Sequence, residues 1–138
     1  MTAQLILSGD LREQIRDEAR AALPRECCGL IEGIREPGTI RAVALHPAAN
    51  LARGDDRFEI DPVEQFRLMH ALRGTGREIV GCYHSHPSGP AAPSPRDADE
   101  AQERDFVWLV AGVGARIALG AFVWDGRAFR ELHLAQDA

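Results

Sequence analysis

Apolar residues recur along this chain with two different spacings, and each spacing predicts one kind of secondary structure. Spacings of three and four predict amphipathic helices at residues 10–23 and 62–73, and a Ser-Pro pair predicts the start of a short third helix at 95–104. Short runs rich in apolar, β-branched and aromatic residues predict strands. Those strands are expected at residues 4–7, 28–34, 39–45, 77–85, 106–111, 116–123 and 128–134.

The helical stripes also predict which side chains face the core. Helices that fall between the strands of one sheet make an α/β fold, here a mixed β-sheet with flanking helices. With 138 residues and 45% hydrophobic content, residues 1–138 are expected to form a single domain. The inward stripes are Leu11, Ile15, Ala19 and Ala22 in the first helix, and Val63, Phe66, Met69 and Leu72 in the second.

Composition excludes some classes of partner. The net charge of -5 argues against nucleic acid, because a polyanion would be repelled. The chain begins without a basic, signal-like segment, and no stretch approaches the ~20 apolar residues that cross a bilayer. We therefore expect a soluble, cytoplasmic protein that binds no membrane. Three cysteines, Cys27, Cys28 and Cys82, are then interpreted as small buried hydrophobes and not as disulfide partners.

The most informative segment joins the fourth predicted strand to the third predicted helix. His84 and His86 are two residues apart at the end of a strand, so their side chains point to the same face. Pro87 ends the strand, and Ser94 and Asp97 begin a helix as its N-cap and third residue. Two imidazoles and one carboxylate within fourteen residues can bind a metal and leave one tetrahedral position open, which is typical of catalytic zinc sites.

A metal-dependent hydrolase also needs a general base that is not a metal ligand. Glu26 is a candidate because it lies between the end of a helix and an apolar segment, at the expected mouth of the sheet. Spacing alone does not separate it from Glu32, Glu59 or Glu78, any of which could be an exposed charge. The Ser94 and Asp97 pair can likewise be explained as a helix cap without any metal.

These segments resemble a known family. His84-Ser85-His86-Pro87 followed by Ser94 and Asp97 is similar to the H-x-H-x7-S-x2-D signature of the JAMM (MPN+) metalloproteases, and residues 24–29 resemble the segment with their catalytic glutamate. The resemblance implies a JAMM/MPN, cytidine-deaminase-like fold. It also implies that His84, His86 and Asp97 bind one zinc ion, that Glu26 is general base and then acid, and that Ser94 steadies the oxyanion.

The resemblance also implies a class of substrate. Short prokaryotic members are similar to enzymes that trim the tail of ubiquitin-like sulfur-carrier proteins, or that release an amino acid such as cysteine from the carrier's Gly-Gly end. An extended tail of this kind can add as a strand beside the active-site sheet. The expected partner is therefore a ubiquitin-like sulfur carrier or its conjugate, and a homodimer is left open.

Several alternatives stay open from the sequence. A non-catalytic MPN-type binding module would lack one or more metal ligands. A zinc deaminase would carry H-x-E and P-C-x-x-C segments, which this sequence lacks. Cys82 shares a strand face with His84 and could be a thiol nucleophile. The segment Gly112-Val113-Gly114 precedes a strand and is interpreted as a turn, not as a dinucleotide-binding loop.

Overall fold

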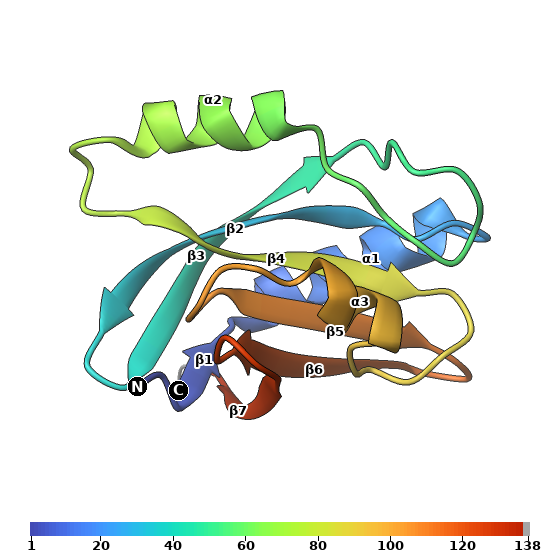
Figure 1. Ribbon diagram of the computed structural model, residues 1–138. Coiled ribbons are helices and arrows are strands. Elements are labelled where there is room, and N and C mark those ends of the chain that lie inside the picture. Colours follow the sequence, from blue (N-terminus) through green and yellow to red (C-terminus); the bar gives the residue numbers. More distant parts are fainter. Residues whose placement is uncertain (137–138) are drawn as a thin grey trace.

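A seven-stranded sheet that closes into a barrel forms the centre of the structure, a computed structural model that describes residues 1–136 (Figure 1). Three helices flank this sheet within the described residues. The elements in chain order are β1 (Gln4–Ile6), α1 (Gly9–Ala22), β2 (Cys28–Glu36), β3 (Thr39–Ala48), α2 (Pro62–Leu72), β4 (Glu78–His86), α3 (Pro95–Glu100), β5 (Val107–Val113), β6 (Ile117–Trp124) and β7 (Phe129–Ala135).

The strands pair in the order β1-β3-β2-β4-β5-β6-β7, and β1 also pairs with β7. Three pairs are parallel, namely β1 with β3, β1 with β7 and β4 with β5, and the others are antiparallel. The predicted α/β fold with a mixed sheet and flanking helices is therefore confirmed. Among residues 1–136, no helix is long and apolar enough to span a membrane.

Two apolar clusters cover the two faces of the sheet. The larger one includes Ile15 and Ala19 of α1, which are fully buried, and Leu11 and Ala22 pack against it as their stripe predicts. The second cluster contains Trp108, Trp124 and Phe58. Neighbouring Cys27 and Cys28 belong to different clusters, because successive side chains of an extended chain point to opposite faces.

The orientation predicted for α2 was wrong at three of four positions. Leu72 is 7% exposed, but Val63, Phe66 and Met69 are 56%, 61% and 50% exposed. The helix instead packs on the second cluster through Leu68, which is partly buried. Residues 66 and 68 point to nearly opposite sides of a helix, because each residue advances about 100° around its axis. Burying Leu68 and Leu72 therefore turns the predicted stripe outward.

Two smaller predictions also need correction. The helix expected at 95–104 ends at Glu100, because the C-cap residue Ala101 is extended and its side chain is buried in the second cluster. Gly112 is not in a turn but in strand β5, which continues to Val113. Only Gly114 lies in the turn before β6.

Candidate metal centre

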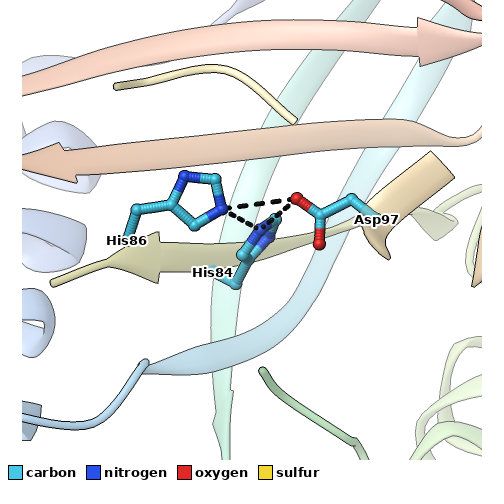
Figure 2. Close-up of side chains that lie close together, drawn as sticks. All are labelled: His84, His86 and Asp97. Carbon is cyan, nitrogen blue, oxygen red and sulfur yellow. Dashed lines mark hydrogen bonds and ion pairs between the residues drawn. The ribbon is translucent and has the colours of Figure 1, made fainter. Parts of the chain in front are cut away.

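The end of β4 and the first turn of α3 bring His84, His86 and Asp97 together (Figure 2). The Nε2 atom of His84 lies 3.1 Å from Nε2 of His86 and 3.0 Å from Oδ2 of Asp97. Nε2 of His86 lies 3.3 Å from the same carboxylate oxygen. Three possible ligand atoms therefore converge on one point, as the sequence predicts.

The spacing of these atoms fits a small tetrahedral cation. For metal–donor distances of about 2.0–2.1 Å, the donors of a tetrahedral ion lie about 3.3 Å apart. The observed separations of 3.0 to 3.3 Å are close to that value. Two imidazoles and one carboxylate are also the donor types that zinc accepts in catalytic sites. The residues present therefore fit a divalent ion such as zinc.

His84 is held by aromatic packing. Its ring is completely buried and stacks on Phe58, with ring centroids 4.3 Å apart and an interplanar angle of 20°. Trp108 meets the same ring edge-on at 5.8 Å. Within residues 1–136, no group hydrogen-bonds to Nδ1 of His84. Burial lowers the pKa of His84, so the ring is held in the neutral form that binds metals.

His86 is oriented by a backbone hydrogen bond. Its Nδ1 lies 2.9 Å from the carbonyl oxygen of Pro90. Because a carbonyl only accepts, Nδ1 carries the proton and donates it. The lone pair of the neutral ring is then on Nε2, the atom that faces His84 and Asp97.

Asp97 is fixed by the cap of α3. The Ser94 N–H donates to Oδ2 of Asp97 at 2.8 Å, and the Asp97 N–H donates to Oγ of Ser94 at 3.1 Å. Ser94 is thus the N-cap that the sequence predicts, and the two hydrogen bonds form a reciprocal capping box. Burial acts to raise the pKa of Asp97, but the nearby imidazoles of His84 and His86 and the hydrogen bond from the Ser94 N–H outweigh it and hold the pKa below its ordinary value. The carboxylate is therefore charged and correctly placed to bind a cation.

Glu26 lies just before β2 and is only 5% exposed. Among the residues that the structure describes, none donates a hydrogen bond to its Oε1. Burial raises the pKa of Glu26 to about 7; His86 opposes this rise, and the carboxylates of Asp97 and Asp56 add to it. A carboxylate with this pKa can take up and release a proton at neutral pH.

The other three glutamates considered from the sequence have different surroundings. Glu32 is buried, but its oxygens pair with His46 at 2.8 Å and with Arg77 at 2.5 Å. Glu78 is exposed and pairs with Arg35. Glu59 is exposed and far less enclosed than Glu26. Of the four, Glu26 alone is both buried and lacking a partner for a carboxylate oxygen within residues 1–136.

Glu26, His86 and Ser94 line one cleft of about 660 Å³. Its walls include Pro24 and the loop 87–90, and Asp55 and Asp56 lie at its margin. The Ser94 oxygen already accepts from the Asp97 N–H, so its hydroxyl proton remains available to donate into the cleft. A buried carboxyl group, a hydroxyl group and one of the two clustered histidines thus line the same space.

Asn50 and Phe58 support this site and were missed by sequence reasoning. The Asn50 amide nitrogen donates to the carbonyls of Glu26, at 3.1 Å, and Arg57, at 3.0 Å. Its Oδ1 accepts from the N–H groups of Ala52 and Glu59. Asn50 therefore joins the backbone of Glu26 to the loop that carries Phe58. It is the only asparagine of the chain, but no local pattern marks it as functional.

Cys82 does not have the surroundings of a nucleophile. It is 6% exposed and belongs to the second apolar cluster, beside Trp108. Burial raises the pKa of the Cys82 thiol well above its ordinary value, so the reactive thiolate is disfavoured. This supports the interpretation of Cys82 as a small buried hydrophobe.

The sequence matches one known family over most of its length. The family described as prokaryotic homologs of the JAB domain matches residues 8–125. A desampylase from Haloferax volcanii is 34% identical over 140 residues, which cover 97% of each protein. A probable TtuB-protein conjugate cleaving protease from Thermus thermophilus is 36% identical over 95 residues, covering 68% of this chain and 61% of that protein. The solution structure of protein DSY2949 from Desulfitobacterium hafniense aligns with a TM-score of 0.87 at 27% identity, covering 97% of this chain and 93% of that one.

Proposed function

Because the chain belongs to the family of prokaryotic homologs of the JAB domain, we propose that it is a zinc-dependent peptidase or isopeptidase acting on the C-terminal tail of ubiquitin-like sulfur-carrier proteins. Family membership confirms the resemblance to short prokaryotic JAMM proteins, and the peptidases among its relatives make the chain a hydrolase. The zinc ion, the roles of individual residues and the substrate are parts of the proposal. So is the assignment of residues 1–138 to a single catalytic domain.

The observation that carries the proposal is the pairing of a complete donor set with a separate buried base. His84, His86 and Asp97 supply three converging donors, while Glu26 lines the same cleft as His86 without being one of them. A closed structural zinc site would use a fourth protein ligand. Three donors beside an uncommitted carboxylate favour catalysis over a purely structural metal site.

In this proposal His84, His86 and Asp97 bind zinc, which supplies Lewis-acid chemistry by making water nucleophilic near neutral pH and polarising a carbonyl group. Glu26 accepts a proton from the attacking water and later returns it to the leaving amine. In the metal-free protein its pKa is about 7, near neutral pH, where a carboxyl group can exchange a proton in both directions. The Ser94 hydroxyl donates to the oxygen that becomes negative as the amide is attacked.

The cleft is consistent with an extended, glycine-containing tail. Five of the residues that line it, Pro24, Pro87, Ser88, Gly89 and Pro90, are prolines or have small side chains. The relative from Thermus thermophilus is described as cleaving TtuB-protein conjugates. Cleavage of protein conjugates of a ubiquitin-like carrier is therefore the activity we propose for this chain.

The direct test uses two substrates built on one ubiquitin-like carrier that ends in Gly-Gly. One carries a C-terminal cysteine and the other is joined through an isopeptide bond to a lysine side chain. Mass spectrometry of products after incubation with zinc-loaded protein should show a new carrier end at the second glycine. Glu26→Gln should retain one zinc per chain and lose activity by a factor on the order of a thousand.

A zinc-loaded protein that cleaves neither substrate would remove the proposed activity. An active Glu26→Gln protein would remove only the assignment of the base. The non-catalytic binding module is separated by metal analysis of the purified protein, since such a module has no need of bound zinc. His84→Ala should lose the metal, and a fully zinc-loaded His84→Ala protein would remove the ligand assignment.

A further inference from the structure

The loop between β4 and α3 passes directly over two glycines of the sheet. A Cβ atom added at Gly112 of β5 would lie 2.6 Å from the Ala91 nitrogen and 2.7 Å from the Gly89 oxygen. A Cβ atom added at Gly120 of β6 would lie 2.2 Å from the Ala91 oxygen. These three atoms belong to the backbone, so no side-chain rotation could relieve the overlap with them; the Phe122 ring is a further neighbour at Gly120, 2.9 Å away.

The strand register places these glycines beside the metal centre. Gly112 is paired with His86 across β4 and β5, and Gly120 is opposite Val110, which is paired with His84. Paired residues on neighbouring strands point to the same face of a sheet. Along β5 the side chains on this face shrink from Trp108 through Val110 to Gly112. A glycine inside a strand usually weakens it, and often marks a place where another backbone approaches closely.

The segment that rests on these glycines also orients a metal-binding histidine. The Pro90 carbonyl, which accepts the hydrogen bond from Nδ1 of His86, lies between Gly89 and Ala91. The height of this segment above the sheet therefore sets the position of the acceptor. A side chain at position 112 or 120 would lift the segment and move the Pro90 oxygen away from the His86 ring.

We propose that Gly112 and Gly120 are positioning residues for the metal centre. Because these glycines have no side chains on this face of the sheet, residues 89–91 can lie close to it. The Pro90 carbonyl can then hold the His86 ring with Nε2 toward His84 and Asp97. This inference rests on the proposed metal site, but it does not depend on the identity of the substrate. The two glycines of the Gly112-Val113-Gly114 segment therefore have different roles. Gly112 makes room for the loop, whereas Gly114 lies in the turn before β6.

Zinc affinity provides the test, measured by competition with a chromophoric chelator at pH 7.5. Gly120→Ala and Gly112→Ala should each weaken zinc binding at least about tenfold, the usual effect of disturbing a hydrogen-bond partner of a metal-binding histidine. Gly114→Ala is the matched control and should stay within about twofold of wild type. A Cβ there has its nearest neighbour at 3.6 Å, an ordinary contact. Thermal unfolding of each variant in EDTA establishes that it is folded.

Gly33→Ala separates positioning from a general disturbance of the sheet. A Cβ atom there would lie 2.7 Å from the Arg41 oxygen, a comparable overlap with backbone, but Gly33 is paired with Glu78, at the opposite end of β4 from His86. Gly33→Ala should therefore keep zinc affinity within about threefold of wild type. Equal losses in Gly33→Ala and Gly120→Ala, or no loss in both Gly112→Ala and Gly120→Ala, would overturn the proposal. If Gly120→Ala does not fold, Gly112→Ala decides. Failure of both to fold would assign the glycines to general stability and also overturn it.

The outcomes also distinguish this inference from the proposed function. Wild-type protein that fails to bind zinc would remove the metal site and, with it, both proposals. Zinc binding that is normal in wild type and unchanged in both glycine variants would remove only the positioning role. If the glycine variants weaken zinc binding but the wild-type protein cleaves no carrier, the positioning role is supported and the proposed substrate is contradicted.

Discussion

Replacing Glu26 by glutamine should stabilise the metal-free protein, and the gain should grow with pH. Glu26 is 5% exposed, and within residues 1–136 its Oε1 has no hydrogen-bond partner. Ionising such a group in the folded protein is costly, because burial removes water without supplying a donor. Glutamine has nearly the same shape and carries no charge, so it removes that cost.

The size and sign of the effect follow from the pKa, which rises from an ordinary 4.5 to about 7 in the folded protein. Below pH 4.5 the carboxyl is protonated in both folded and unfolded chains, and there is no penalty. Between pH 4.5 and 7 the carboxyl is ionised in the unfolded chain but still protonated in the folded one. The free energy of unfolding therefore falls by about 1.4 kcal/mol for each pH unit. Above pH 7 the penalty levels off at about 3 kcal/mol.

Urea unfolding in EDTA, followed by the fluorescence of buried Trp108 and Trp124, measures the difference. Relative to wild type, Glu26→Gln should gain about 1 kcal/mol at pH 5 and about 3 kcal/mol at pH 8.5. Glu131→Gln is the control, since Glu131 is an exposed glutamate on β7. Its effect should stay within about 0.5 kcal/mol at both pH values.

A gain of the same size at pH 5 and pH 8.5 would refute this reasoning, because it would show that the stabilisation is unrelated to ionisation. A loss of stability at pH 8.5 would refute it more directly. Repeating the measurement with bound zinc should reduce the difference between wild type and Glu26→Gln. The nearby positive charge favours the carboxylate and so lowers the cost of ionising it.

Three further changes probe the groups around the cleft. Ser94→Ala should lower kcat on the order of a hundredfold and lower the free energy of unfolding by about 1 kcal/mol through loss of the helix cap. Ser94→Thr keeps the hydroxyl group and should retain most of the activity and most of the stability. Asn50→Ala should lower kcat while zinc content by mass spectrometry stays at one per chain; zinc loss in proportion to activity would contradict its assignment to the Glu26 side of the cleft. Phe58→Ala should lower the free energy of unfolding in urea by about 3 kcal/mol and weaken zinc affinity about tenfold. Phe66→Ala, on the exposed face of α2, should change neither quantity. Equal effects of the two substitutions would contradict the importance of the ring stacked on His84.

The convergence of the three proposed metal ligands could be predicted from the sequence because local chain geometry brings them together. Alternation along a strand puts His84 and His86 on one face, and a helix cap fixes Asp97 relative to Ser94. These relations hold within fourteen residues and need little information from the rest of the fold. The choice of Glu26 was different, because spacing did not separate it from other glutamates. Its burial, and the ion pairs of Glu32, exist only in the folded chain.

The features that sequence reasoning missed depend on contacts between distant segments. The apolar residues of α2 form two candidate stripes, and only the neighbouring sheet selects Leu68 and Leu72 over Phe66. Gly112 could be recognised as a contact for the loop only from the register that pairs it with His86. Asn50 acts through backbone carbonyls, which leave no trace in the identity of the residues that carry them.

The same contacts explain why Glu26 keeps a raised pKa in surroundings that contain several N–H donors. Nδ1 of His86 is engaged by Pro90, the Ser94 N–H by Asp97, and the Asn50 amide by two backbone carbonyls, one of them that of Glu26 itself. A hydrogen bond from any of these donors to the Glu26 carboxylate would favour its ionised form and lower its pKa. The carboxylate would then hold a proton too weakly to return it to a leaving amine at neutral pH. The proposed ability of Glu26 to act as both base and acid therefore depends on where its neighbours direct their hydrogen bonds.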